Sequence, residues 1–245
     1  MKTAGVIPAR WASTRFEGKV LAPIDGQPMI EHVWRRARQC RRLDELWIAC
    51  DDQRVYEAAN AFGAQAIMTD PNHVSGTERI AEVAGKIKAD IFVNIQGDEP
   101  LIDPGVIDAL AHMMQDDPRC PMGTPVCRLT DPEDLNNPNV VKVVIDHNGY
   151  ALYFSRVAIP FNRDKKSPVE VVYYKHIGLY AYRREFLLNW KNLPVSQLEM
   201  AERLEQLRIL EAGWKIKTFV TEFESVGVDT VQDIKRVAAR LKQEK

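Results

Sequence analysis

Residues 91–100 read IFVNIQGDEP, an apolar run that leads straight into an acidic turn. Strands that are apolar along their length are typical of the middle of a parallel sheet, where helices cover both faces. The glycine, aspartate and proline that follow are residues that favour a turn. The stretch therefore predicts a buried strand over 91–95 whose carboxyl end places Asp98 at the edge of a sheet.

Three shorter apolar runs come before this strand and alternate with helical patterns. Apolar residues recur at helical spacing over 28–40, and Pro28 suits the first turn of that helix. Gly63 is well placed to end a second helix, Thr77 can cap a third, and Pro104 opens a fourth. This alternation predicts right-handed crossovers and a mostly parallel sheet. The three runs are AGVI (4–7), ELWIAC (45–50) and QAIM (65–68).

The second half of the chain has a different pattern, in which neighbouring strands are predicted to pair as hairpins. Residues 140–155 predict two strands joined by the glycine-containing turn HNGY, and 171–182 predict a further strand. Leucine and isoleucine at helical spacing predict one long helix over 198–213. A strand at 214–223 and a closing helix at 231–243 complete a half that mixes strand directions.

Length and charge bound the class of protein. The chain has 245 residues, which favours one extended α/β domain over 1–245, with a nucleotide-binding half (1–125) joined to a mixed half (126–245). Its 33 Lys and Arg against 34 Asp and Glu leave a formal net charge of −1. Because proteins that coat nucleic acid need clustered positive charge, we expect no nucleic-acid partner.

Cysteine usage and hydropathy indicate the compartment. The four cysteines form no C-x-x-C pair and have no histidine at metal-ligand spacing, so we expect free thiols in a reducing cytosol. The N-terminal apolar stretch is too short for a signal peptide, and no run approaches the roughly 20 apolar residues that a membrane span needs. We therefore expect a soluble, cytoplasmic protein without a membrane partner.

A basic segment follows the first predicted strand, where residues 7–19 read IPARWASTRFEGK. Three cations and two hydroxyl side chains in one loop suit a triphosphate, which needs both positive charge and hydrogen-bond donors. The loop is not a Walker A motif, since no Ser or Thr follows its Gly-Lys pair, and the chain also has no G-x-G-x-x-G. On spacing alone, a solvated surface loop is an equally good interpretation. The five side chains are Arg10, Ser13, Thr14, Arg15 and Lys19.

Two carboxylates could complete such a site. Asp98 follows a buried strand, and Asp229 lies in GVDT (227–230) at a predicted junction between strand and helix. Mg²⁺ is usually held by one or two carboxylates together with substrate phosphates, so this pair could hold the ion. A turn at Asp98 and a helix cap at Asp229 are the alternative interpretations.

Two further segments are ambiguous when each is taken alone. SGTER (75–79) is first of all a helix N-terminus, although its free N–H groups could also bind the polar edge of a ligand. The alternating aromatic residues of KHIGLYAY (175–182) are more typical of a core strand than of a site. Neither segment identifies a function by itself.

Nine stretches of the chain, in order and without large gaps, resemble the signature blocks of the 3-deoxy-manno-octulosonate cytidylyltransferase family, also called CMP-Kdo synthetases. The resemblance extends from about residue 3 to about residue 237. A single block would be weak evidence, but nine in the same order make a chance match improbable. The blocks are IPARWASTRFEGK, PMIEHV, SGTERIAEV, VNIQGDEPLI, NPNVVKVV, YALYFSRVAIPF, KHIGLYAYRREF, LEQLRILEAG and GVDTVQDI.

The resemblance implies a reaction and a fold. Members of the family transfer CMP from CTP to the anomeric hydroxyl of the eight-carbon sugar acid Kdo, releasing pyrophosphate and supplying lipopolysaccharide biosynthesis. The implied fold is a nucleotidyltransferase-type α/β sandwich, with a mostly parallel sheet flanked by helices. The implied cofactor is Mg²⁺ and the implied partner is a second copy of the chain. The second half, 126–245, would then contribute to the sugar pocket and the dimer contact.

The resemblance also implies roles for individual residues. The basic loop would surround the CTP phosphates, with Arg10, Arg15 and Lys19 acting in catalysis, and Asp98 and Asp229 would hold the metal. Ser75, Gly76 and Thr77 would lie near cytosine and ribose, in the same nucleotide site as Ser13 and Thr14. The sugar acid would contact Arg79, Gln96, Arg156, His176, Tyr180, Glu202, Glu205 and Gln206.

The chain departs from the family pattern at three places in and beside the basic loop. Ala12 stands where members usually have glycine, which limits a positive φ there. Glu17 and Val20 stand where members usually have proline, so we expect this loop to be more flexible when empty. The 8-amino analogue of Kdo is the alternative substrate, since it differs far from the reacting centre. CMP-sialate synthetases lack the later blocks. Intact Asp98, Asp229 and Lys19 argue against a non-catalytic nucleotide-binding protein, and the absent glycine fingerprint argues against a dinucleotide-dependent oxidoreductase.

Overall fold

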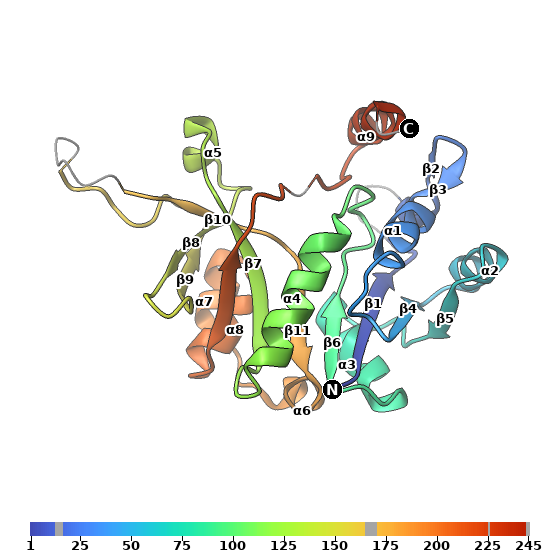
Figure 1. Cartoon of the computed structure of the whole chain (residues 1–245), viewed down its shortest axis with the longest axis horizontal. Coiled ribbons are helices and arrows are strands. Elements are labelled where there is room, and N and C mark those ends of the chain that lie inside the picture. The colour runs from blue at the N-terminus through green and yellow to red at the C-terminus, as the bar shows by residue number, and fades with distance from the viewer. Residues whose placement is uncertain (13–16, 165–170, 225, 244–245) are drawn as a thin grey trace.

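The computed structural model describes residues 1–12, 17–164, 171–224 and 226–243. Its centre is a 10-stranded sheet (Figure 1), in which β12 (Ile216–Val220) pairs with β7 beside the main order of strands. From one edge to the other this order is β5 (Gln65–Met68), β4 (Glu45–Cys50), β1 (Thr3–Ala9), β6 (Ile91–Asn94), β11 (Tyr180–Arg183), β7 (Met122–Arg128), β10 (Tyr174–His176), β8 (Lys142–Ile145) and β9 (Ala151–Ser155).

The sheet joins the two predicted halves of the chain. Strands β5, β4, β1 and β6 run parallel to one another, as the alternation of strands and helices predicts. The antiparallel strand β11 bonds to β6 on one side and to β7 on the other, so a strand from the second half connects both halves. The predicted α/β class, with a parallel first half and a mixed second half, is confirmed.

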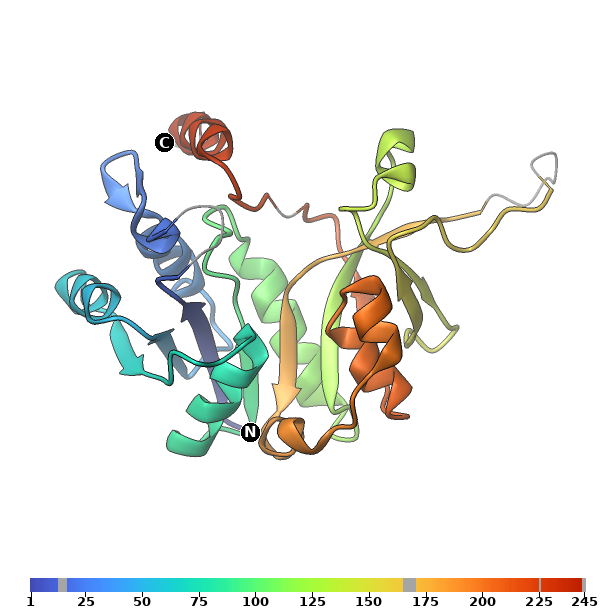
Figure 2. The same ribbon diagram turned by 180° about the vertical axis from the view of Figure 1, so that it is seen from behind.

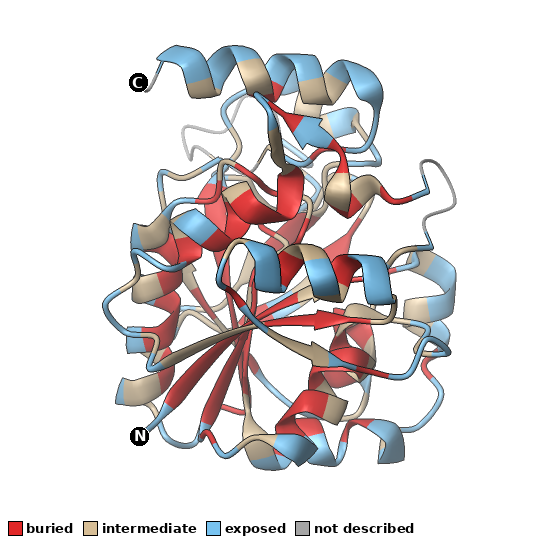
Figure 3. Ribbon diagram, turned by 90° about the vertical axis from the view of Figure 1, so that its right-hand side faces the viewer, coloured by how far each residue is buried: buried red, intermediate tan, exposed pale blue. Residues whose placement is uncertain are grey.

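Helices cover both faces of the sheet (Figures 1 and 2). Consecutive strand residues point to opposite faces, and Val6 and Ile7 on β1 accordingly lie in two separate core clusters. Figure 3 shows buried residues gathered in the sheet and on the inner sides of the helices. The Ile7 cluster includes residues of α1 (Met29–Ala37), α2 (Gln53–Ala61) and α4 (Pro104–Asp116), and the Val6 cluster includes residues of α3 (Gly76–Lys86), α6 (Arg184–Leu188) and α8 (Gln206–Glu211).

Two predicted helix features are wrong. Ser75, and not Thr77, caps α3, since its side chain accepts a hydrogen bond from the Glu78 N–H at 3.2 Å. The long helix predicted over 198–213 is broken into α7 (Gln197–Glu202) and α8 by Arg203, whose φ of 55° is left-handed. The Arg156 guanidinium supports this break, because it donates to the carbonyl oxygens of Glu202 at 2.6 Å and of Arg203 at 3.3 Å.

The single strand predicted over 171–182 is also interrupted. Its two parts, β10 and β11, both run antiparallel to β7. Between the residue pairs His176–Val126 and Ala181–Gly123, the segment that contains β10 and β11 has two more residues than β7. A bulge of this kind re-aims the side chains beside it. On the side away from β7, β10 pairs with β8 and β11 pairs with β6.

The C-terminal segment returns over the edge of the sheet at which the parallel strands end. After β12 the chain crosses this edge and enters α9 (Val231–Gln243), which lies above α1 in Figure 1. Val237 of α9 packs with Val228, Ile24 and Met29 in a small cluster of its own. None of the helices in the described ranges is long and apolar enough to cross a membrane. The remaining elements are β2 (Pro23–Ile24), β3 (Gln27–Pro28), α5 (Pro132–Asn136) and the 3-10 helices η1 (Lys19–Leu21) and η2 (Trp190–Asn192).

The two ends of the predicted basic loop are joined by several contacts. The Gly18 N–H donates to the Trp11 carbonyl oxygen at 3.0 Å, and the Trp11 indole N–H donates to the Glu17 carboxylate at 2.8 Å. The Arg54 guanidinium lies over the indole, 3.5 Å from the ring centroid. Gly18 has a φ of 68°, and a Cβ there would lie 2.7 Å from the indole. Glycine is therefore required at this position for both backbone and packing reasons.

We expect Gly18→Ala to lower the free energy of unfolding by about 1–3 kcal/mol more than Gly63→Ala does, because the new methyl group overpacks against the indole. Gly63 is a matched control, since its φ is 85° but a Cβ there would meet nothing within 4 Å. Urea denaturation followed by circular dichroism measures both losses. Equal losses in the two variants would show that the contact with Trp11 is unimportant for stability.

Candidate active site

A cavity of ≈ 240 Å³ lies where the loops after β1, β5 and β6 meet. Ligands of parallel α/β sheets bind at this edge, because the carboxyl ends of the strands converge there. The structure brings the predicted nucleotide residues of three separate loops to the walls of this one cavity, which supports the interpretation of the basic loop as a binding loop. The predicted residues on its walls are Arg10, Lys19, Ser75, Gly76, Arg79, Gln96 and Asp98.

Lys19 connects the two predicted metal carboxylates. Its ammonium group lies 2.7 Å from Asp98 Oδ2 and 3.5 Å from Asp229 Oδ1, and it also donates to the Val228 carbonyl oxygen at 2.8 Å. The Val228 N–H in turn donates to the Asp98 carbonyl oxygen at 2.9 Å. Two aspartates from distant parts of the chain thus converge on one positive charge, at the place where the C-terminal segment crosses the sheet.

The residues present fit a magnesium ion. Asp98 and Asp229 supply hard carboxylate oxygens, which Mg²⁺ prefers, and their convergence on the Lys19 ammonium shows that both reach one small region. Among the residues that the structure describes, no group of three or more His, Cys, Asp or Glu side chains could hold a metal ion by itself. Two carboxylates would leave the other coordination positions to phosphate oxygens and water.

Of the other predicted residues of the basic loop, the structure describes only Arg10. Arg10 is exposed on the cavity wall and, within the described part of the chain, has no ion-pair partner, so its charge is available to an anion. The predicted residues Ser13, Thr14 and Arg15 lie outside the described residues. A close approach of two strand ends helps to shape this wall, since a Cβ on Gly97 would lie 2.7 Å from the Pro8 carbonyl oxygen.

The N-terminus of α3 forms a second wall. Ser75 and Gly76 line the cavity, but Thr77 is buried and does not. The Thr77 hydroxyl instead donates to Glu205 Oε2 at 2.7 Å and lies 3.3 Å from the Tyr182 hydroxyl. Burial raises the pKa of Glu205, with the hydrogen bond from Thr77 acting in the opposite direction. Thr77 and Glu205 therefore connect the two halves of the chain beneath the site.

A second group of polar and aromatic side chains includes Gln96, Asn94, Tyr180 and Gln206. The Gln96 side-chain amide donates to Asn94 Oδ1 at 3.2 Å, and Asn94 pairs with Tyr180 across β6 and β11. The Tyr180 hydroxyl donates to Gln206 Oε1 at 3.4 Å. Gln206 is buried, and its Nε2 has no hydrogen-bond partner among the described residues. A buried amide without a partner costs free energy unless a ligand or water accepts its hydrogen bond.

His176 is part of the same group and packs between aromatic rings. Its ring lies 5.2 Å from both Phe154 and Tyr180 between ring centroids, and its Nε2 lies 3.1 Å from Thr124 Oγ1. Burial lowers the pKa of His176 to about 3, so the imidazole is neutral at physiological pH. These contacts agree with the interpretation of this strand as core packing, and His176 is not among the residues that line the cavity.

Three predicted sugar contacts are already occupied by protein partners. The Glu202 carboxylate accepts from the Ser155 hydroxyl at 2.6 Å and from the Arg156 N–H at 2.9 Å, which ties β9 to the end of α7. The Arg156 guanidinium is used at the helix break at Arg203. The Arg79 side chain is almost fully buried in an ion pair with Asp51, at 2.8 Å.

Sequence reasoning missed two residues that contact the predicted site residues Arg79 and Gln96. Asp51 follows the strand at 45–50 directly, and Asp98 comes shortly after 91–95, so the same rule for strand ends could have found Asp51. Asn94 is buried inside β6 and gives no local signal. Its importance depends on its partner on β11, a strand that is distant in the sequence.

Comparison with known proteins agrees with this geometry. The family model described as Cytidylyltransferase matches residues 4–217. A 3-deoxy-manno-octulosonate cytidylyltransferase of Solibacter usitatus is 54% identical over 241 residues, which cover 98% of this chain and 95% of the relative. A protein of the same name from Geotalea daltonii is 50% identical over 250 residues and covers 99% of both chains.

Solved structures give the same result. A CMP:2-keto-3-deoxy-manno-octonic acid synthetase complexed with CTP superposes with a TM-score of 0.95 at 46% identity and covers 100% of both chains. A 4-diphosphocytidyl-2C-methyl-D-erythritol synthase from Anaerococcus prevotii, with a TM-score of 0.66 at 11% identity over 98% of both chains, shares the fold alone. The chain therefore belongs to the 3-deoxy-manno-octulosonate cytidylyltransferase family.

Proposed function

We propose that this protein transfers CMP from CTP to the anomeric hydroxyl of Kdo and releases pyrophosphate, as a step of lipopolysaccharide biosynthesis. The observation that carries the proposal is the convergence of Lys19, Asp98 and Asp229 beside a cavity whose wall includes Arg10. Support also comes from the full-length similarity to a synthetase solved with CTP. A cytoplasmic location accompanies the proposal, and cell fractionation tests it.

The nucleotide is assigned to the first half of the chain, residues 1–125. Arg10 and Lys19 would hold the triphosphate together with Ser13, Thr14 and Arg15, and the N-terminus of α3 at Ser75 and Gly76 would face the nucleoside. Positive charge and N–H donors together are what an anionic phosphate chain requires. The 126–245 half would supply the sugar site, and the buried Nε2 of Gln206 supports this assignment because it needs an acceptor.

Mg²⁺ is the proposed cofactor, held by Asp98 and Asp229. The two carboxylates both face the Lys19 ammonium. A metal cation that binds beside Lys19 would therefore meet two carboxylates that already point to the same region. When bound, the cation supplies electrostatic stabilisation of the negative charge on the phosphates. The protein itself contributes Lys19 and Arg10, whose positive charges would stabilise the negative charge on the departing pyrophosphate.

The reaction needs orientation more than covalent chemistry. The sugar hydroxyl oxygen forms a bond to the α-phosphorus, the bond from that phosphorus to the pyrophosphate oxygen breaks, and the hydroxyl proton passes to water. His176 is neutral and bonded to Thr124, so its contribution is a fixed hydrogen-bonding edge and not the uptake of that proton. Tyr180, Gln206 and Gln96 would orient the sugar acid on the same side.

The decisive assay measures pyrophosphate release with CTP and Mg²⁺, comparing Kdo, its 8-amino analogue and sialic acid. We expect release with Kdo at a kcat/KM at least about tenfold above that with either alternative, since one polar group in a pocket discriminates at this level or more. Preference for the 8-amino analogue would reassign the substrate within the same reaction. No release with any of the three acids would refute the proposed activity.

Asp98→Asn and Asp229→Asn should each lower kcat by at least about 100-fold, the scale of a lost electrostatic group in a phosphoryl-transfer site. Turnover measured over a range of Mg²⁺ concentrations should show weaker activation by the ion. Asp116→Asn is the control, because this exposed carboxylate lies at the far end of α4. Kinetics close to wild type in either site variant would exclude that residue as a metal ligand.

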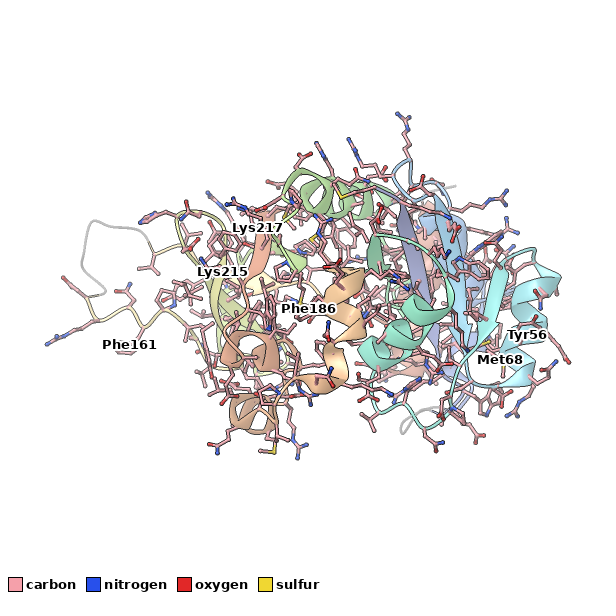
Figure 4. All side chains as sticks on the ribbon, turned by 90° about the horizontal axis from the view of Figure 1, so that it is seen from below. Tyr56, Met68, Phe161, Phe186, Lys215 and Lys217 are labelled. Carbon is pink, nitrogen blue, oxygen red and sulfur yellow. The ribbon has the colours of Figure 1, made fainter. Side chains whose placement is uncertain are left out.

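We propose that the protein is a homodimer formed through its second half. Leu152, Val157 and Phe161 are 60%, 67% and 86% exposed, and Phe161 lies on an arm that projects from the body (Figure 4). Three exposed apolar side chains within residues 152–161 favour an interaction surface in this part of the chain. Met68, 38% exposed on the strand at the opposite edge of the sheet, offers a matched position away from this surface.

Sedimentation velocity at micromolar concentration should give the mass of a dimer. We expect Phe161→Ser to weaken the dimer by about tenfold or more, the effect of truncating a buried aromatic anchor, and Met68→Ser to leave it unchanged. A monomeric wild-type protein at these concentrations would refute the dimer.

A further inference from the structure

We infer that Arg79 and Asp51 are positioning residues that hold the nucleotide loops in place, and that Arg79 does not contact the sugar acid. The inference rests on the proposed function and assigns its nucleotide affinity to a buried ion pair. Both side chains are hidden, with only 3% of Arg79 and 8% of Asp51 exposed, and their charged atoms lie 2.8 Å apart.

Such a pair must do more than neutralise itself, because burying two charges costs more than their attraction returns unless further hydrogen bonds satisfy them. Asp51 has a second partner of this kind. Its Oδ1 accepts the Trp11 backbone N–H at 2.8 Å, while its Oδ2 faces Arg79. The carboxylate therefore fixes the chain one residue after Arg10, at the start of the basic loop.

Arg79 has further partners on another loop of the cavity. Its Nη1 donates to the Thr69 hydroxyl and, at 3.5 Å, to the Asp70 carbonyl oxygen. The Thr69 hydroxyl itself donates to the Cys50 carbonyl oxygen at 2.8 Å. The guanidinium thereby fixes the start of the segment that leads from β5 to the cavity wall at Ser75.

The ion pair of Arg79 and Asp51 thus joins the segments that follow β1, β4 and β5, at the edge where the proposed nucleotide site lies. Arginine is suited to this task because its planar fork presents several donors in fixed directions, whereas lysine presents a single ammonium group. A sugar-acid carboxylate could reach the guanidinium only in competition with Asp51. The geometry therefore assigns Arg79 to the order of the loops and not to substrate contact.

The test is calorimetric binding of CTP with Mg²⁺, followed by KM for Kdo at saturating CTP. We expect Arg79→Lys to raise the Kd for CTP by about tenfold or more, the effect of losing hydrogen bonds to a charged group, with KM for Kdo within about twofold of wild type. Arg183→Lys is the control. Arg183 also donates to backbone carbonyl oxygens, but it lies near the amino ends of the parallel strands, away from the cavity. The control should leave both constants unchanged.

Thr69→Val provides a second variant that keeps the ion pair and nearly the same volume. It removes one bond of the guanidinium, so the Kd for CTP should rise several-fold with the fold retained, and the Trp11 amide should exchange its hydrogen no faster than in wild type. In Arg79→Lys the same amide should exchange faster, because Asp51 loses its partner.

An unchanged Kd for CTP in Arg79→Lys, or a rise confined to KM for Kdo, would overturn the inference. Failure of the proposed function gives a different result. A wild-type protein that binds CTP but makes no CMP-sugar still permits the calorimetric comparison, whereas one that binds no CTP refutes the nucleotide site itself.

Discussion

The mutual repulsion of two carboxylates is the constraint on which the site depends. Asp98 and Asp229 come from distant parts of the chain, and the Lys19 ammonium lies 2.7 Å from the first carboxylate and 3.5 Å from the second. The same ammonium holds the Val228 carbonyl oxygen, and the Val228 N–H returns to Asp98, so the C-terminal segment is attached to the strand end by charge and by backbone together. The cavity, the basic loop and the crossing of the sheet edge all meet at this point.

Much of this arrangement could be predicted from the sequence, because local patterns determine it. Apolar runs alternating with helical patterns predict a parallel sheet, and a parallel sheet brings the ends of its strands to one edge. Lys19 and Asp98 each follow a predicted strand, so topology alone places them close together. The contact with Asp229 depended on the resemblance to a family, since nothing local in GVDT distinguishes a metal ligand from a helix cap.

Features that depend on distant partners could not be predicted. The helix break at Arg203 follows from the Arg156 guanidinium on another element, which holds the carbonyl oxygens that a continuous helix would use. Thr77 belongs to a connection with Glu205, not to the cavity. The burial of Arg79 with Asp51 likewise requires two loops to meet. In each case, contacts between residues distant in the sequence override what the local pattern predicts.

The small cluster around Val237 gives the site an uneven mechanical character. Val228, Ile24, Met29 and Val237 pack apart from the two large clusters that hold the sheet together. A segment held by few apolar contacts opens at a lower free energy than the core does. One side of the proposed metal site is thus built on the sheet and the other on the C-terminal segment, which we expect to open at a lower free energy than the sheet does. In the proposed function, Asp98 and Asp229 would then act on the phosphates from two parts of the fold that differ in stability.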